Sequence, residues 1–326
     1  MRPFAYHRPD TVEDAVSALS AEGAHPLAGG TTMIDLIKLD VRRPVSLVDI
    51  SALGLTGVRF EDGRIRLGAL ATMSEVAGHE RLKAEYPLLT EALHLAASPQ
   101  LRNVATLGGN VLQRTRCPYF RDTSYPCNKR QPGSGCAAVD GYNRLHAVLG
   151  VSDRCIASYP GDFAVSLAAL DAEVETAGPQ GGRTIPFEEL HRLPGDSPEV
   201  ETVLEPGELI TAILVEQTPL GRASTYYKVR DRESYAFANA SAAAALEIDG
   251  ETVSDVRLAL GGVASKPWRA RPAENALRGA RLTESAARRA GEIALEGATT
   301  FEHNAFKVPL AVETVIEALM SAKARA

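Results

Sequence analysis

All four cysteines of this chain fall within 39 of its 326 residues, at Cys117, Cys127, Cys136 and Cys155. The gaps between them are nine, eight and eighteen residues. Four thiolates at such varied spacing are typical of iron–sulfur clusters, and a Cys-Pro pair like Cys117-Pro118 also occurs in ferredoxins. Zinc sites normally contain cysteines only about two to four residues apart, which are missing here. A [4Fe-4S] cluster is the favoured interpretation, while a zinc site, disulfides and free thiols stay open.

Basic residues flank these cysteines along the chain. They are Arg114, Arg116, Arg121, Lys129 and Arg130. A [4Fe-4S] cluster held by four thiolates is net negative, so nearby cations would stabilise it. The alternative interpretation is a solvated basic loop surface.

Two glycine-rich segments could bind phosphate. Ala28-Gly29-Gly30-Thr31-Thr32 lies between a predicted strand and a predicted helix, and Thr106-Leu107-Gly108-Gly109-Asn110 has similar chemistry. Paired glycines let the backbone turn tightly, and the N–H groups left free there attract anions. Neither segment is a dinucleotide fingerprint or a Walker loop. Together they favour a long phosphate-bearing ligand such as a dinucleotide, with ordinary Gly-Gly turns as the alternative.

The first 50 residues predict a βαβ-like unit that would position the first glycine segment. Thr11-Val-Glu-Asp14 is a weak capping box, and it starts a helix over 12–19. A short strand at 26–28 precedes the glycines, a second helix covers 33–38, and the next strand covers 45–50.

The pattern changes from residue 57. Residues 57–68 alternate around Asp62-Gly63, which predicts a hairpin. Residues 114–155 break every periodicity, and a loop of this length in a globular domain is usually functional or disordered. Between them, helical periodicity covers three segments: 72–80, 86–97 and 98–104.

The rest of the chain mixes strands and helices, which predicts an α+β protein. A buried helix is expected at 162–170. Strands are expected at 172–176, 184–185, 208–215 and 223–230. Segments 237–248 and 256–262, with helices at 273–278, 284–296 and 308–324, complete the C-terminal region. The domain boundary is expected at Pro219-Leu-Gly221.

Composition excludes several classes of protein. The formal net charge of −6 argues against a nucleic-acid binder, whose surface is usually basic. No apolar run approaches the roughly 18 residues that a bilayer span needs, so no membrane insertion is expected. The N-terminus has neither an apolar region nor a twin-arginine pair, so we expect no export signal. No nucleophile is paired with a base, so no catalytic residue is assigned.

The glycine segments, with Gly261-Gly-Val263, resemble those of the FAD-binding medium subunit of the molybdenum hydroxylases, the group of xanthine dehydrogenase and carbon monoxide dehydrogenase. The resemblance runs from Phe4-Ala-Tyr6 to the C-terminal helix. Residues 113–136 are more specific, because they resemble the flavin subunit of bacterial periplasmic aldehyde oxidoreductases, which carries an extra [4Fe-4S] cluster. A similar insertion occurs in 4-hydroxybenzoyl-CoA reductase.

The resemblance implies which residues bind the cofactors. Thr106, Gly109 and Asn110 would hold the second side of the FAD diphosphate and the ribityl region. Asp162 would contact the sugar-like chain of the flavin or cap the following helix. Lys228 would lie near the isoalloxazine or at the surface end of a strand. The four cysteines would ligate the cluster. The FAD pyrophosphate would be wrapped by the first segment: Leu27, Ala28, Gly29, Gly30, Thr31, Thr32, Met33 and Ile34.

The implied architecture is a two-subdomain FAD-binding domain of the PCMH/VAO-like type over 1–220. Its subdomains would cover about 1–55 and 56–220, with the [4Fe-4S] loop inserted at 114–156. A smaller α+β domain of the CO dehydrogenase flavoprotein type would cover 221–326.

The implied function is electron transfer in an oxidoreductase. An aldehyde would be oxidised on a large molybdopterin subunit, and electrons would pass through a small [2Fe-2S] subunit to FAD and then to an external acceptor. A xanthine dehydrogenase or a 4-hydroxybenzoyl-CoA reductase-like enzyme is the alternative within the family. A self-sufficient flavin oxidase and a zinc-stabilised, non-enzymatic binding module are alternatives outside it. The expected location is the periplasm, by co-export with a signal-bearing partner, and otherwise the cytoplasm.

Overall fold

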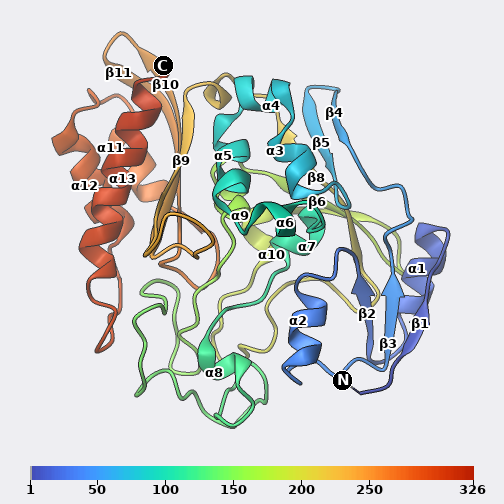
Figure 1. The fold of residues 1–326 in the computed structure, drawn as a ribbon. Helices are drawn as coiled ribbons and strands as arrows, with labels where there is room; N and C mark the ends of the chain where they lie inside the picture. Colours follow the sequence, from blue (N-terminus) through green and yellow to red (C-terminus); the bar gives the residue numbers. More distant parts are fainter. Residues whose placement is uncertain (1) are drawn as a thin grey trace.

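The computed structural model describes residues 2–326 and contains three sheets that follow one another along the chain (Figure 1). The N-terminal sheet is parallel, in the order β1-β3-β2. A side-chain cap starts its first helix, because Thr11 Oγ1 accepts a hydrogen bond from the N–H of Asp14 at 3.1 Å. The βαβ prediction is confirmed, with β1 (Ala5–His7), α1 (Val12–Leu19), β2 (Ala24–Leu27), α2 (Met33–Lys38) and β3 (Ser46–Asp49).

The middle sheet is antiparallel, in the order β4-β5-β8-β6-β7. Its first hairpin turns at Asp62 and Gly63, which both have positive φ, as a two-residue hairpin turn with the right twist requires. The predicted hairpin is therefore confirmed. The strands are β4 (Val58–Glu61), β5 (Arg64–Gly68), β6 (Glu173–Ala177), β7 (Arg183–Pro186) and β8 (Leu209–Glu216).

Short helices pack on the middle sheet. The helical segment predicted over 72–80 is a short helix, α3, that ends at Ala77. After Gly78 a second helix, α4, begins at Glu80 with His79 as its cap. The second glycine segment forms the start of a helix, α7, with Thr106 as its cap, and is not the Gly-Gly turn that the sequence left open as an alternative. The helices are α3 (Met73–Ala77), α4 (Glu80–Glu85), α5 (Pro87–Leu95), α6 (Pro99–Arg102), α7 (Leu107–Val111), α9 (Phe163–Ala169) and α10 (Phe187–Leu190).

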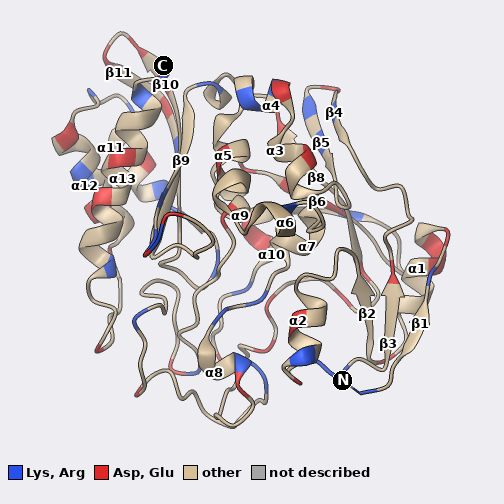
Figure 2. Ribbon diagram, viewed as in Figure 1, with Lys and Arg blue, Asp and Glu red and all other residues tan. Residues whose placement is uncertain are grey.

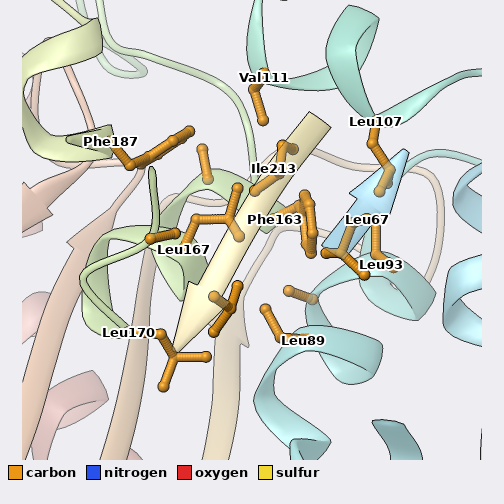
Figure 3. Close-up of a cluster of buried hydrophobic side chains, with 14 of the residues drawn as sticks. Leu67, Leu89, Leu93, Leu107, Val111, Phe163, Leu167, Leu170, Phe187 and Ile213 are labelled. Atoms are coloured by element: carbon orange, nitrogen blue, oxygen red, sulfur yellow. The ribbon is translucent and has the colours of Figure 1, made fainter. Parts of the chain in front are cut away.

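Helix α9 lies at the centre of the main core. All seven of its residues are buried, as the sequence predicts for 162–170. Figure 3 shows Phe163 and Leu167 of α9 among side chains of α5 and β8, including Leu89 and Ile213. Burial of this many large side chains stabilises the fold by roughly 1.5–3 kcal/mol for each one.

The C-terminal sheet has the order β12-β11-β10-β9 and is antiparallel. Alanines fill its central strand, so helices approach closely on both faces: Ala242 and Ala244 pack in the core beneath α13, whereas Ala243 belongs to the core around α9. A 3-10 turn at Pro219–Gly221 precedes this sheet. Its elements are β9 (Ser224–Val229), β10 (Ala240–Asp249), β11 (Thr252–Gly261), β12 (Trp268–Arg269), α11 (Arg271–Leu277), α12 (Glu284–Ala294) and α13 (Lys307–Lys323).

The main hydrophobic core extends from the middle sheet to the C-terminal sheet, with α9 between them. Helix α9 contacts β10, β11 and β12. The buried guanidinium of Arg269 donates to the carbonyl of Ala168 at 2.6 Å and to Asp171 at 2.8 Å. The same guanidinium pairs with the buried carboxylate of Glu274.

The long loop at 114–155 contains one short helix, α8 (Pro118–Arg121). It runs below α2 and the C-terminal sheet in the view of Figure 1, and Figure 2 shows basic residues along it. Cys127 and Cys136 face each other in an isolated antiparallel bridge within this loop. Within residues 2–326, no helix is both long enough and apolar enough to cross a membrane.

Candidate functional site

The first glycine segment connects β2 to α2 and packs closely on the chain before the second one. Gly30 has a φ of +72°, in the left-handed region that favours glycine. A Cβ on Gly29 would stand only 1.8 Å from the carbonyl oxygen of Val104, so only glycine fits at this contact. The first glycine segment therefore lies directly against the backbone of Val104, two residues before the second segment.

The first segment also leaves polar groups free. Among residues 2–326, no backbone acceptor receives the N–H groups of Thr31, Thr32 and Met33, and Thr32 makes no side-chain cap of α2. Free N–H groups after paired glycines are the arrangement that binds phosphate oxygens. The segment can therefore hold an anionic group.

The second glycine segment presents a buried acceptor. Thr106 caps α7 and accepts a hydrogen bond from the N–H of Gly109 at 3.4 Å. Asn110 donates from Nδ2 to the sulfur of Met73 at 3.4 Å. Its Oδ1 is buried and has no hydrogen-bond partner within residues 2–326. Because buried polar atoms are nearly always paired, this oxygen indicates a ligand that donates a hydrogen bond.

A cavity of about 810 Å³ brings both segments together. The C-terminal region contributes the other wall: Asp231, Arg232, Tyr235, Ala236, Phe237, Ala238, Ser241 and Gly262. The predicted residues that line it are Thr31, Thr32, Gly109, Asn110 and Asp162. The predicted residues that do not line it are Leu27, Ala28, Gly29, Gly30, Met33, Ile34, Thr106 and Lys228. We call this the large cavity.

Asp162 and Lys228 form a buried ion pair at its edge. The Nζ of Lys228 lies 2.8 Å from Oδ2 of Asp162 and also donates to the carbonyl of Leu95 at 3.0 Å. Tyr226 donates to the other carboxylate oxygen at 2.5 Å, and burial, with the charge of Asp162, raises the pKa of Tyr226 well above its usual value. Asp162 makes no side-chain cap of α9, and Lys228 is 1% exposed, so neither the cap nor the surface alternative holds.

The four cysteines meet around one small cavity under α8, which we call the cysteine cavity. All four are free of disulfides. Burial raises the pKa of Cys117 to about 12 and that of Cys155 to about 11. A thiolate at either position therefore requires a strong positive partner, which a metal centre supplies.

The spacing of these thiols does not suit a single metal ion. Within the described part of the chain, no group of three or more His, Cys, Asp or Glu side chains is close enough to hold one ion. Four thiolates around one zinc would have to converge to Zn–S distances of about 2.3 Å. In a [4Fe-4S] cluster each thiolate binds a different iron, so the four sulfurs need not converge on one point.

The basic residues of the loop are mostly paired, which corrects the alternative of a solvated surface. Arg121 donates to both oxygens of Asp35 at 2.7 and 3.0 Å. Arg130 donates to the carbonyls of Tyr119 and Phe120 at 2.8 and 2.7 Å. Arg114 and Lys129 both contact the carboxylate of Glu201. These contacts hold the loop in place around the cysteine cavity.

A neighbouring cavity of about 390 Å³ shares Gln113 and Tyr159 with the large cavity. Glu201 lies in its wall beside Arg114 and Lys129. Burial alone would raise the pKa of Glu201, but these two cations outweigh it and lower the pKa below its usual value. The carboxylate is therefore ionised and paired.

The sequence analysis missed three residues of the site. His146 lines the large cavity and lies 3.2 Å from Sγ of Cys117, and Cys117 itself lines both the large and the cysteine cavities. Tyr235 and Phe237 lie at the mouth of the large cavity and are about half exposed. A single histidine or aromatic residue in a loop has no spacing signal that would reveal such a position.

Comparison with known proteins identifies the family. Residues 2–216 match the model of the FAD binding domain in molybdopterin dehydrogenase, and residues 225–322 match that of the CO dehydrogenase flavoprotein C-terminal domain. The chain belongs to the FAD-binding subunits of the molybdenum hydroxylase family. The expected fold class, an FAD-binding domain followed by an α+β domain of the CO dehydrogenase flavoprotein type, is confirmed.

Two curated relatives and one solved structure cover nearly the whole chain. The aldehyde oxidoreductase FAD-binding subunit PaoB of Escherichia coli (strain K12) is 47% identical over 329 residues, with 100% of both chains covered. The carbon monoxide dehydrogenase medium chain of Afipia carboxidovorans is 29% identical and covers 98% of this chain and 95% of its own. The structure of the cyanide-inactivated Cu,Mo-CO dehydrogenase matches with a TM-score of 0.78 at 29% identity over 100% of both chains. The chain is thus an oxidoreductase subunit that binds FAD.

The residues of the large cavity fit this cofactor. The free N–H groups after Gly29-Gly30 suit a diphosphate, and the unpaired Oδ1 of Asn110 suits a hydrogen-bond donor of the flavin or its side chain. A cavity of about 810 Å³ is within the range of cofactor sites.

Proposed function

We propose that this chain is the electron-transfer flavoprotein subunit of a three-subunit molybdenum-dependent aldehyde oxidoreductase. Its partners would be a small [2Fe-2S] subunit and a large molybdopterin subunit, and its electrons would leave to an external acceptor. The aldehyde as substrate rests on the 47% identity to the FAD-binding subunit of an aldehyde oxidoreductase. FAD bound here would supply a carrier that accepts electrons singly and delivers them in pairs.

We also propose that Cys117, Cys127, Cys136 and Cys155 ligate a [4Fe-4S] cluster. The observation that carries this proposal is that all four thiols line one cavity without a disulfide, although they are spread over a loop with little regular structure. A soluble domain with large apolar cores needs no such convergence for packing. Lys129 and Arg154 line this cavity and would offset the negative charge of a thiolate-bound cluster.

The chain's own residues have separable tasks in FAD binding. Thr31 and Thr32 present N–H groups and hydroxyls to the diphosphate, and Asn110 accepts a hydrogen bond through its free Oδ1. Asp162 presents a carboxylate to the cavity wall, where it would accept from a ribityl hydroxyl. Lys228, behind the wall, keeps that carboxylate charged and in place through the 2.8 Å ion pair, so its role is indirect.

The test is cofactor analysis of the full chain purified without oxygen. We expect yellow flavin at one FAD per chain and four iron and four labile sulfide atoms. Cys136→Ser is expected to abolish the broad brown absorption while FAD stays bound, and Ser152→Ala, on the same loop, is the matched control that keeps both. Full retention of iron in Cys136→Ser would show that the ligand assignment is wrong.

Partners and substrate need a second experiment. The tagged chain, expressed with its neighbouring genes, should copurify with a subunit that contains two [2Fe-2S] centres and with a molybdenum subunit, and the complex should reduce an artificial acceptor with aldehydes. Turnover of xanthine or of an aromatic thioester instead would favour the other branches of the family. Turnover by the isolated chain would favour a self-sufficient oxidase.

A further inference from the structure

His146 lies between the two proposed cofactor sites. Its ring lines the large cavity, and its Nε2 is 3.2 Å from Sγ of Cys117, the cysteine that lines both cavities. The residue is only 2% exposed, so the contact with sulfur replaces a contact with water. His146 therefore lines the large cavity and can also influence the sulfur of a proposed cluster ligand.

The backbone around His146 holds the ring in place. Its N–H donates to the carbonyl of Asn143 at 3.0 Å. Asn143 is fully buried and donates in turn to the carbonyl of Ala138 at 3.2 Å. From the C-terminal domain, Asn304 donates to the carbonyl of Ala147 at 3.1 Å. These hydrogen bonds fix the backbone of the segment that carries His146 from both sides.

The surroundings decide which nitrogen carries the proton. A neutral imidazole has one N–H, on one of its two ring nitrogens. Nδ1 is buried and has no partner within residues 2–326. A proton on Nδ1 would be a buried donor without an acceptor, whereas a proton on Nε2 faces the sulfur of Cys117. The hydrogen-bond network therefore assigns the proton to Nε2.

We propose that His146 donates a hydrogen bond from Nε2 to the thiolate of Cys117 and thereby raises the reduction potential of the [4Fe-4S] cluster. This inference rests on the proposed function, because it requires Cys117 to be a cluster ligand. Reduction adds negative charge to the cluster and its sulfurs, so an N–H donor stabilises the reduced state more than the oxidised state. His146 is thus a positioning residue that acts through Cys117.

The experiment compares three substitutions at this position. His146→Leu keeps the volume but removes the donor, His146→Gln keeps an N–H near the place of Nε2, and His146→Asn keeps an amide too short to reach the sulfur. We expect His146→Leu and His146→Asn to shift the one-electron reduction equilibrium about tenfold toward the oxidised cluster, which is about 59 mV for one electron. His146→Gln should stay near the wild-type value.

The readout is an EPR-monitored potentiometric titration of the full chain, with iron analysis of every variant. His191→Leu is the matched control, because His191 is also buried and its Nε2 lies 2.9 Å from the carbonyl oxygen of Val111, not beside a sulfur. It should leave the potential unchanged.

The outcomes separate the two proposals. A wild-type chain without four irons would overturn the cluster, and with it this inference. Wild-type iron content together with an unchanged potential in His146→Leu and His146→Asn would overturn the role of His146 alone. If His146→Leu loses iron through misfolding, the difference in potential between His146→Gln and His146→Asn decides, and equal potentials would refute the hydrogen bond.

Discussion

Gly29→Ala gives the sharpest test of how the large cavity is built. The new Cβ would stand 1.8 Å from the carbonyl oxygen of Val104 and 2.7 Å from its carbonyl carbon. Both are backbone atoms, so no side chain can turn aside. The first glycine segment would have to move by more than an ångström, away from the second segment and from the position where both contact a diphosphate.

The size of the effect follows from this overlap. Extra atoms in a packed site cost about 1–3 kcal/mol when the surroundings must shift, and a backbone overlap belongs at the upper end. A loss of about 2 kcal/mol would lower the melting temperature of a chain of 326 residues by about 3 °C. Because each 1.4 kcal/mol is a factor of about ten in affinity, we expect FAD to bind at least about tenfold more weakly. The assays are thermal melting and titration of the flavin-stripped chain with FAD, followed by absorbance.

Gly63→Ala is the control that separates the effect of backbone strain on stability from the effect of the Gly29 contact on FAD binding. Gly63 has a φ of +75° in the β4–β5 hairpin, and a Cβ there meets nothing within 4 Å. This variant should lower stability by about 1–2 kcal/mol through backbone strain alone and leave the FAD affinity at the wild-type value. Wild-type melting and FAD affinity in Gly29→Ala would refute the reasoning that the Gly29–Val104 contact sets the cavity.

Three further predictions concern buried charges. Lys228→Met should destabilise the fold by about 3–5 kcal/mol in urea denaturation, because it leaves Asp162 buried without its partner, and adding Asp162→Asn should recover most of the loss; an unchanged midpoint would contradict the ion pair. Burial lowers the pKa of Lys307 to about 7 from its usual 10.5, so the folded state loses this proton at a lower pH than the unfolded state. The free energy of unfolding should therefore rise as pH increases from about 7 to 10.5. Lys307→Met should flatten that rise. Burial would raise the pKa of Glu208, but hydrogen bonds from Arg183 and Thr176 outweigh it, and the pKa falls to about 2. The stabilisation that Glu208 contributes should therefore be complete above pH 4.5 and lost toward pH 2. Glu208→Gln should weaken this acid dependence in melting curves.

Local signals in the sequence predicted much of the fold. The Thr11 cap, the Asp62-Gly63 turn and the period of residues 12–19 act over a few residues, and each is found in the structure. The structure of the second glycine segment could not be predicted from its own residues. Glycines favour turns in isolation, but Thr106 caps a helix there and Gly108 packs against Ala69, a contact with another part of the chain.

The candidate site divides in the same way. The glycine segments and the clustered cysteines are visible in the sequence itself. In the structure all four cysteines line one cavity, whereas only Thr31, Thr32, Gly109 and Asn110 of the glycine segments line the other. The positions of His146 and Lys228 depend on contacts across more than 25 residues, with Cys117 and Asp162 respectively. Spacing along one chain carries no information about such contacts. Only the resemblance to a family drew attention to Lys228, and it suggested a different role.

The continuous core between the middle and C-terminal sheets has a consequence for the rate of electron flow. The large cavity has one wall on each side of this core, and α9 and Arg269 bind the two sides together. A hinge motion between the two sheets would have to break these buried contacts. If the chain carries electrons as proposed, the fold would then fix each tunnelling distance inside the subunit. Turnover should then respond to driving force and to the docking of outside partners, and not to the viscosity of the medium.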